Sequence, residues 1–158
     1  MAVNKTTNLK LNTWLENDPV DFEEINENFN IIDSLPICIE SGTKTGTYTG
    51  GTTTVNTWRY KKYSDGSIEM FTKLEFDNLK CNSGTEAPYY SGSSKVTFPF
   101  ALKAVRDVQM HLASNTIGWI SDTTGRNVID YVSFRIAAIH KEDSAEYKQV
   151  FINVKGEI

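Results

Sequence analysis

The sequence predicts a mostly β protein with one short helix near its N-terminus. Two observations lead to this fold class. Apolar residues recur at helical spacing before residue 35, and short runs of alternating apolar and polar residues, separated by turn residues, fill the chain from residue 55 onward. About seven such runs after a single helix are typical of a β-sandwich, so we expect a jelly-roll-like head.

Composition and charge exclude several classes of protein. The 158 residues carry a formal net charge of -4, with Lys and Arg scattered among Asp and Glu. Such a pattern makes no basic patch able to neutralise phosphates, so nucleic acid is not an expected partner. The N-terminus lacks a basic segment followed by an apolar run, and no stretch reaches the roughly 18 apolar residues of a membrane span. We therefore expect neither a signal peptide nor membrane insertion.

The first regular element is a helix predicted over residues 21–33. Asp21, followed by Glu24 three residues later, has the spacing of an N-terminal capping box. Four apolar residues fall on one face at steps of three or four: Phe22, Ile25, Phe29 and Ile32. A helix of this length is marginal in isolation, so this stripe must be buried against the rest of its own chain or against the same helix of neighbouring chains.

A second apolar group precedes the helix and contains Leu9, Leu11, Trp14 and Leu15. Leu9 and Leu11 alternate as they would in a strand. Leu11, Trp14 and Leu15 instead fit one helical turn, so both structures stay open. A tryptophan on an N-terminal arm is usually docked, either on its own domain or on a partner.

The chain changes composition after the helix. Residues 41–54 are nearly all Gly and Thr, a mixture that favours extended backbone but supplies no core. We expect residues 38–57 to form a neck or an edge strand. This neck would join an N-terminal helical segment, residues 1–37, to a β-sandwich head, residues 58–158.

The head begins with a predicted hairpin. Asp65 and Gly66 separate two strand-like runs, and an Asp-Gly pair in this position is a strong hairpin signal. A two-residue loop at this pair would place Tyr63 opposite Ile68. A long loop is expected over residues 77–94. The expected strands of the head are residues 55–63, 68–76, 95–100, 105–113, 116–121, 131–139 and 147–154.

The chain contains two cysteines, Cys38 and Cys81, which lie far apart and form no CxxC pair. A chain of this length does not need disulfide staples to hold a core. We therefore expect free thiols rather than a bridge between them.

Aromatic residues on predicted loops are the candidate ligand-binding residues. Sugars present flat apolar faces that stack on aromatic rings, while neighbouring polar groups fix their orientation. Tyr89 and Tyr90 lie in the long loop, and Trp119 lies near Asn115 and Asp122. The alternative for Trp119 is core packing. For the two tyrosines it is a loop pinned to the head, or a contact between copies of the chain.

The motifs of common enzymes are absent: the sequence has no P-loop, no GxSxG elbow and no HExxH zinc motif. The two histidines, His111 and His140, lie on or at the end of strand-like runs, without metal-ligand spacing around them. A glycosidase needs two carboxylates at a set separation, and scattered acidic residues do not by themselves supply it. The sequence therefore predicts no catalytic residue, no metal and no cofactor.

Residues 9–33 resemble the N-terminal segment of phage tail and baseplate proteins from Gram-positive hosts. The residues that carry this resemblance are Leu9, Leu11, Trp14, Asp18-Pro19-Val20, Phe22, Asn26-Glu27-Asn28-Phe29 and Ile32-Asp33. Residues 58–66 resemble the hairpin of C-terminal tail-fibre domains, although Tyr63 stands where that family often has Trp. Thr97-Phe98-Pro99-Phe100, followed by an alternating strand, is also similar to those heads. Residues 116–158 show no resemblance that we can name.

The resemblance implies a receptor-binding protein of a phage tail or a phage-tail-like bacteriocin, and hence a homotrimer. The helix stripe would mediate oligomerisation, and Leu9, Leu11 and Trp14 would attach the chain to other tail or baseplate proteins. The head would point outward and bind bacterial surface polysaccharide. The chain would then be part of a virion or extracellular particle that is assembled in the host cytoplasm. Two other functions stay open: a structural baseplate component without a ligand, and a surface-polysaccharide hydrolase.

Overall fold

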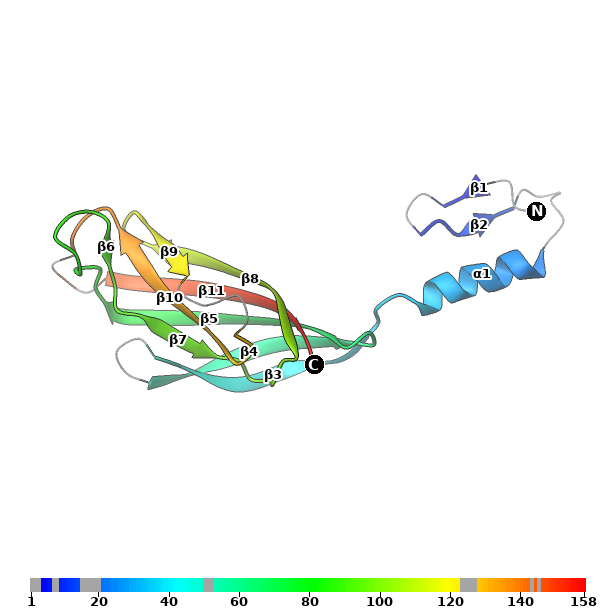
Figure 1. Ribbon diagram of the computed structural model, residues 1–158, viewed down its shortest axis with the longest axis horizontal. Coiled ribbons are helices and arrows are strands. Elements are labelled where there is room, and N and C mark those ends of the chain that lie inside the picture. The colour runs from blue at the N-terminus through cyan, green and yellow to red at the C-terminus, as the bar shows by residue number, and fades with distance from the viewer. Residues whose placement is uncertain are drawn as a thin grey trace. The chain divides into compact units, whose positions relative to one another are not determined.

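The computed structural model describes residues 4–6, 9–14, 21–49, 53–122, 128–142, 144 and 146–158. The chain forms two compact units, Met1–Ile37 and Cys38–Ile158. The first contains the helix, and the second contains a large sheet (Figure 1). The predicted class, mostly β with one short N-terminal helix, is therefore confirmed for the described residues.

The helix α1 spans Phe22–Asp33 and begins as its sequence predicts. Asp21 is the N-cap, and its side-chain Oδ1 accepts a hydrogen bond from the backbone N of Glu23 at 2.9 Å. This bond satisfies one of the donors that the first turn leaves free. Glu24, the acidic partner of the predicted capping box, accepts a hydrogen bond from Trp14 Nε1 at 3.1 Å.

Two short strands, β1 (Asn4–Lys5) and β2 (Asn12–Thr13), precede α1 in the chain and pair with each other. Asn12 holds β2 on the helix. Its backbone N donates to Asn28 Oδ1 at 2.6 Å, and Asn28 Nδ2 donates back to the backbone O of Asn12 at 3.0 Å. Asn12 Nδ2 also donates to Glu27 Oε2 at 2.7 Å. The arm is therefore docked on its own helix by polar contacts.

The second unit is built on one antiparallel sheet of nine strands. The strands are β3 (Cys38–Thr49), β4 (Thr53–Tyr63), β5 (Ser67–Leu79), β6 (Tyr89–Tyr90), β7 (Ser94–Thr97), β8 (Ala104–Ser114), β9 (Gly118–Asp122), β10 (Tyr131–Ala138) and β11 (Glu146–Glu157). Their order is β6-β10-β7-β3-β4-β5-β11-β8, and β9 pairs with the other side of β10. We expected two packed sheets. The described strands instead form one continuous ladder that curls around its own core (Figure 1).

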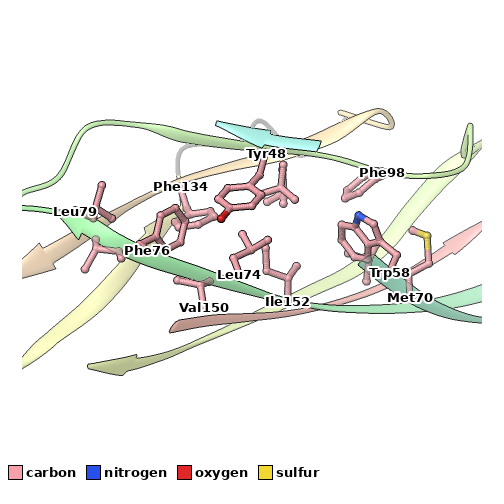
Figure 2. Close-up of a cluster of buried hydrophobic side chains, with 14 of the residues drawn as sticks. Tyr48, Trp58, Met70, Leu74, Phe76, Leu79, Phe98, Phe134, Val150 and Ile152 are labelled. Atoms are coloured by element: carbon pink, nitrogen blue, oxygen red, sulfur yellow. The ribbon is translucent and has the colours of Figure 1, made fainter. Parts of the chain in front are cut away.

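One face of the curled sheet forms the core (Figure 2). Trp58 and Phe134 are its largest fully buried apolar side chains, and Trp58 meets Phe98 edge to face with ring centroids 6.0 Å apart. Full burial of one large apolar side chain stabilises a fold by about 1.5–3 kcal/mol. Further members of the core are Tyr48, Ile68, Met70, Leu74, Phe76, Val96, Val132, Ile136, Val150, Ile152 and Val154.

The predicted hairpin forms, but its predicted register is wrong by one residue. Lys62 pairs with Ile68, so the loop has three residues rather than two. The backbone N of Gly66 donates to the O of Tyr63 at 3.1 Å, and Gly66 has a φ of 81°. This is a turn followed by a residue in the left-handed region, the usual three-residue hairpin loop. The shift puts Trp58 and Ile68 on the same face, whereas the predicted register would have separated them.

The Thr- and Gly-rich segment has the extended backbone that its composition predicts. Residues 38–49 form β3, which pairs along its length with β4 in the sheet. Most β3 side chains are exposed, with Tyr48 as the buried exception. The division of the chain into attachment segment, neck and head stays a prediction.

Both cysteines are free thiols: Cys38 is exposed and Cys81 is buried. Across the part of the chain that the structure describes, no helix has the length and apolar content to cross a membrane. The exposed stripe of α1 belongs to a helix of 12 residues.

Candidate functional site

Three strands place two aromatic side chains in one row on the face opposite the core. In the register of the sheet, Tyr90 of β6 lies opposite Ala137 of β10, and Ala137 lies opposite Trp119 of β9. Residues directly opposite each other in a sheet share a face. Two strand spacings separate the backbones of Tyr90 and Trp119 by about 10 Å. We call Tyr90, Ala137 and Trp119 the aromatic row.

The aromatic row is open to solvent at Trp119, whose exposed fraction is 46%. Ala137 between the two rings is fully buried, and Tyr90 is half-buried. Ile117 and Ile139 extend the apolar surface past the end of β9, where the backbone N of Ile139 donates to the O of Ile117 at 3.3 Å. Both isoleucines are exposed. Contiguous exposed apolar side chains of this kind make this surface a candidate for contact with a ligand or a partner.

The other predicted ligand-binding residues lie around this row. Tyr89 is next to Tyr90 but points to the opposite face, where it packs against the core. Asn115 is exposed on the turn between β8 and β9. The side chain of Asp122 lies outside the described residues. The structure thus brings Tyr90 and Trp119 together and separates Tyr89 from them.

Sequence reasoning missed Ala137, Ile117 and Ile139 as neighbours of the tryptophan. Their proximity depends on the pairing of β9 with β10, and β10 begins at Tyr131, several residues after β9 ends at Asp122. Ile117 and Trp119 are two residues apart, and residues at this spacing in a strand lie on the same face. This spacing could have identified Ile117 as a neighbour of the tryptophan.

A polar concavity lies at the same end of the sheet and has a volume of about 390 Å³. Its lining residues are Asn115, Thr116, Ile117, Ala138, His140, Lys141, Glu142, Ser144 and Glu146. The concavity shares Ile117 with the apolar surface beside the aromatic row. An aromatic surface and convergent polar groups, the two components of a typical small-ligand site, are therefore adjacent here.

A buried ion pair supports this end of the sheet. Lys148 Nζ donates to Glu142 Oε2 at 2.8 Å and to the backbone O of Leu79 at 3.1 Å, and both charged side chains are almost fully buried. Glu142 Oε2 also accepts from the backbone N of Cys81 at 2.7 Å, and Glu142 Oε1 accepts from Thr116 Oγ1 at 3.0 Å. The bonds from Lys148, Cys81 and Thr116 tie the Glu142 carboxylate to neighbouring segments, so it acts as a clamp.

The titration of this cluster follows from its surroundings. Burial opposes ionisation of Glu142, but hydrogen bonds from Lys148, the Cys81 N–H and the Thr116 hydroxyl outweigh it and hold its pKa below the ordinary value. Burial, together with the nearby Glu142 carboxylate, raises the pKa of the Cys81 thiol to about 11. A thiol with this pKa is protonated at neutral pH and does not act as a nucleophile.

Gly118 sets the close approach of β9 to β10, and replacing it tests this geometry. A Cβ at this position would lie 2.5 Å from the carbonyl O of Ala137. Backbone cannot move away cheaply, so we expect Gly118→Ala to lower the free energy of unfolding by about 1–3 kcal/mol. Denaturant unfolding measures this. Gly92→Ala is the control, because a Cβ there meets nothing within 4 Å. Equal stability of the two variants would contradict the close approach of these strands.

The predicted oligomerisation residues form an exposed stripe on α1. The exposed fractions are 79% for Phe22, 60% for Phe29 and 42% for Ile32, and Ile25 is half-buried. Their own unit therefore leaves the stripe largely uncovered.

The predicted attachment residues are only partly exposed. Leu9 is exposed, whereas Leu11 and Trp14 are half-buried. The bond from the Trp14 indole to Glu24 shows that this tryptophan contacts its own helix. Its role in attachment stays a prediction.

Within the described ranges, no group of three or more His, Cys, Asp or Glu side chains is placed to hold a metal ion. His111 is exposed on β8, and His140 lines the polar concavity. Glu142, the buried carboxylate of that concavity, is already held by Lys148.

Comparisons with known proteins find a structural similarity but no family. No protein-family model matches the chain, and no curated protein matches it. A solved structure described as the Pseudomonas aeruginosa R1 pyocin fibre, comprising its C-terminal residues 323–701, is similar with a TM-score of 0.49 and 12% sequence identity. The similarity covers 87% of this chain and 32% of the fibre chain, so this chain spans about a third of that structure. The expected link to Gram-positive hosts finds no support in these comparisons.

Proposed function

We propose that the chain is a non-enzymatic, receptor-binding tail-tip protein of a phage-like particle, and that it attaches the particle to bacterial surface glycan. The observation that carries this proposal is the aromatic row. Tyr90 and Trp119 present rings on a solvent-facing sheet surface, beside a polar concavity of about 390 Å³. Sugar rings stack on aromatic faces and take hydrogen bonds from adjacent polar groups, so this combination suits a glycan.

Two further observations support the proposal. Residues 9–33 resemble the N-terminal segment of phage tail and baseplate proteins, and the unit that contains them is separate from the β unit. A chain of two units can use one unit for attachment and the other for binding. The N-terminal unit, with Leu9, Leu11 and Trp14, would contact other tail or baseplate proteins.

We also propose that the chain is a homotrimer held by the stripe of α1. Phe22, Phe29 and Ile32 are large apolar side chains that stay exposed although β2 already covers another face of the helix. Burial of such side chains favours association by about 25 cal/mol for each Å² removed from water. The number of copies follows from the resemblance to trimeric tail proteins.

Trp119→Ala tests glycan binding directly. The full chain is applied to an array of bacterial surface oligosaccharides and polysaccharides, and the affinity for any bound glycan is then measured by calorimetry. We expect Trp119→Ala to weaken that binding at least about tenfold, equal to about 1.4 kcal/mol, because the sugar ring loses the indole on which it stacks. Tyr90→Ala should weaken binding of the same glycan.

Tyr147→Ala is the matched control, since Tyr147 is an exposed aromatic residue of β11 outside the aromatic row. Unchanged affinity in both row variants would remove the aromatic row from the proposal. A wild-type chain that binds no glycan of the array would favour a structural tail component instead.

A further inference from the structure

A second surface of the sheet has the composition of a binding face, and it lies on other strands than the aromatic row. It is the solvent side of β4, β5, β11 and β8, opposite the core. Phe71 of β5 and Phe151 of β11 stack there with ring centroids 6.4 Å apart and an interplanar angle of 24°. Both rings are half-buried although they point away from the core. Solvent-side positions of a sheet are usually polar, so this aromatic pair needs an explanation.

The register surrounds the two rings with polar side chains. Phe71 lies between Arg59 of β4 and Asn153 of β11. Phe151 lies between Lys73 of β5 and His111 of β8. The next row of the same face holds Gln149, whose Nε2 donates to Glu75 Oε1 at 3.1 Å. Guanidinium, amide and imidazole groups next to flat rings are the groups that fix the hydroxyls of a stacked sugar.

Two concavities flank this aromatic pair. One has a volume of about 750 Å³ and is lined by Arg59, Phe71 and Phe151, among others. The other has a volume of about 480 Å³ and also contains Arg59 and Phe71 in its lining. Both volumes fall in the range of small-ligand sites, roughly 300–1,000 Å³. Because the two concavities share a wall on one face, they suit a chain of several sugar rings better than a single ring.

The charges of the face favour a neutral occupant. Arg59 and Lys73 balance Glu75 and Asp77 in the lining of the larger concavity. The smaller one is bordered by a row in which positive and negative side chains alternate across four strands: Lys61, Glu69, Lys155 and Asp107. Lys155 Nζ and Glu69 Oε1 are 3.0 Å apart in that row. A polyanion would find no net positive surface in the larger concavity.

A simpler explanation is that Phe71 and Phe151 only stabilise the sheet, as cross-strand aromatic pairs do by about 0.2–1 kcal/mol. That explanation accounts for the stacking. It does not account for the two adjoining concavities, whose common wall includes one ring of the pair.

We propose that the solvent face of β4, β5, β11 and β8 is a second glycan-binding surface, which takes a linear, uncharged polysaccharide across Phe71 and Phe151. The ligand class rests on the proposed function, but the site does not: it shares no residue with the aromatic row.

The test uses the full chain and an array of neutral linear oligosaccharides of three or more sugars. Phe71→Thr combined with Phe151→Thr removes the rings and keeps residues that favour strands. Arg59→Ser changes the shared wall and leaves the aromatic stack intact, so it remains informative if the double variant folds poorly. Tyr131→Thr is the control, because Tyr131 lies on β10, outside the proposed face, and lines neither concavity.

We expect a neutral oligosaccharide whose affinity falls at least tenfold in the double variant and severalfold in Arg59→Ser, but stays unchanged in Tyr131→Thr. The same oligosaccharide should still bind the Trp119→Ala variant, and this separates the two sites. The proposal is overturned if no neutral oligosaccharide depends on Phe71 and Phe151. It is also overturned if the double variant changes only the molecular mass in solution, since the face would then be an interface between copies.

Discussion

Replacing Glu142 by leucine should destabilise the β unit by about 3–5 kcal/mol, the usual cost of leaving one member of a buried ion pair unpaired. In Glu142→Leu, the ammonium of Lys148 would stay buried with only the backbone O of Leu79 as a described partner. The backbone N of Cys81 and the hydroxyl of Thr116 would also lose their acceptor. Denaturant unfolding, followed by tryptophan fluorescence, measures the change.

Two further variants separate the charge effect from lost packing. Combining Glu142→Leu with Lys148→Met removes both charges, so the double variant should be more stable than Glu142→Leu alone. Glu75→Leu is the control, because Glu75 forms an exposed pair with Lys73 at 2.7 Å and should change stability by less than about 1 kcal/mol. Equal losses in Glu142→Leu and Glu75→Leu would contradict the buried clamp.

The same ion pair predicts how the stability of the β unit changes at acidic pH. The pKa of Glu142 is held below its ordinary value in the folded chain, after burial is outweighed by the bonds from Lys148 and its other donors. The stabilisation is therefore complete above the unfolded pKa of about 4.3 and is lost as the pH falls through the lower folded pKa. In Glu142→Gln, the free energy of unfolding should depend less on pH in this acidic range. Glu75→Gln should change that dependence less.

Disrupting the stripe of α1 should reduce the mass of the protein in solution from about three chains to one. Phe22→Ser combined with Phe29→Ser removes the two most exposed aromatic side chains of the helix, with exposed fractions of 79% and 60%. The N-cap Asp21 and the docking pair of Asn12 with Asn28 are left in place. Light scattering at several concentrations gives the masses.

Asn26→Ser combined with Asn30→Ser is the matched control, because both residues lie on α1 outside the stripe. The control should keep the wild-type mass. A wild-type chain that is monomeric at all concentrations would contradict the stripe-mediated trimer. The chain would then assemble only on its particle, as a structural adaptor does.

The sequence was sufficient to predict α1 and the longer strands of the β unit, because each depends on local patterns, but not the two-residue strands β1 and β6. The helix begins at Phe22, directly after the predicted cap Asp21, and the expected strands all lie within described strands or overlap them. The hairpin register failed because Asp-Gly serves both two-residue and three-residue loops. A further check was available: Trp58 and Ile68 are both strongly apolar, and only the observed register puts them on one face.

Strand order could not be read from the sequence, and the candidate site depends on it. The aromatic row unites Tyr90, Ala137 and Trp119 from three strands, and no local spacing relates these positions. Tyr89 and Tyr90 were both predicted as ligand-binding residues because the long loop was expected to be irregular. In fact β6 is a short strand, so adjacent tyrosines point to opposite faces.

The turn between β8 and β9 has a consequence for solubility. Each of these strands has one described partner, β11 for β8 and β10 for β9, so they form the two edges of the curled sheet. Exposed strand edges are templates for aggregation. Here residues 115–117 join the two edge strands. Gly118 lies close to β8, since a Cβ added to it would be 3.6 Å from Leu112 Cδ2. At that end of the sheet β8 and β9 shield each other's edges. A strand of another molecule would have to separate β8 from β9 before it could pair with either edge.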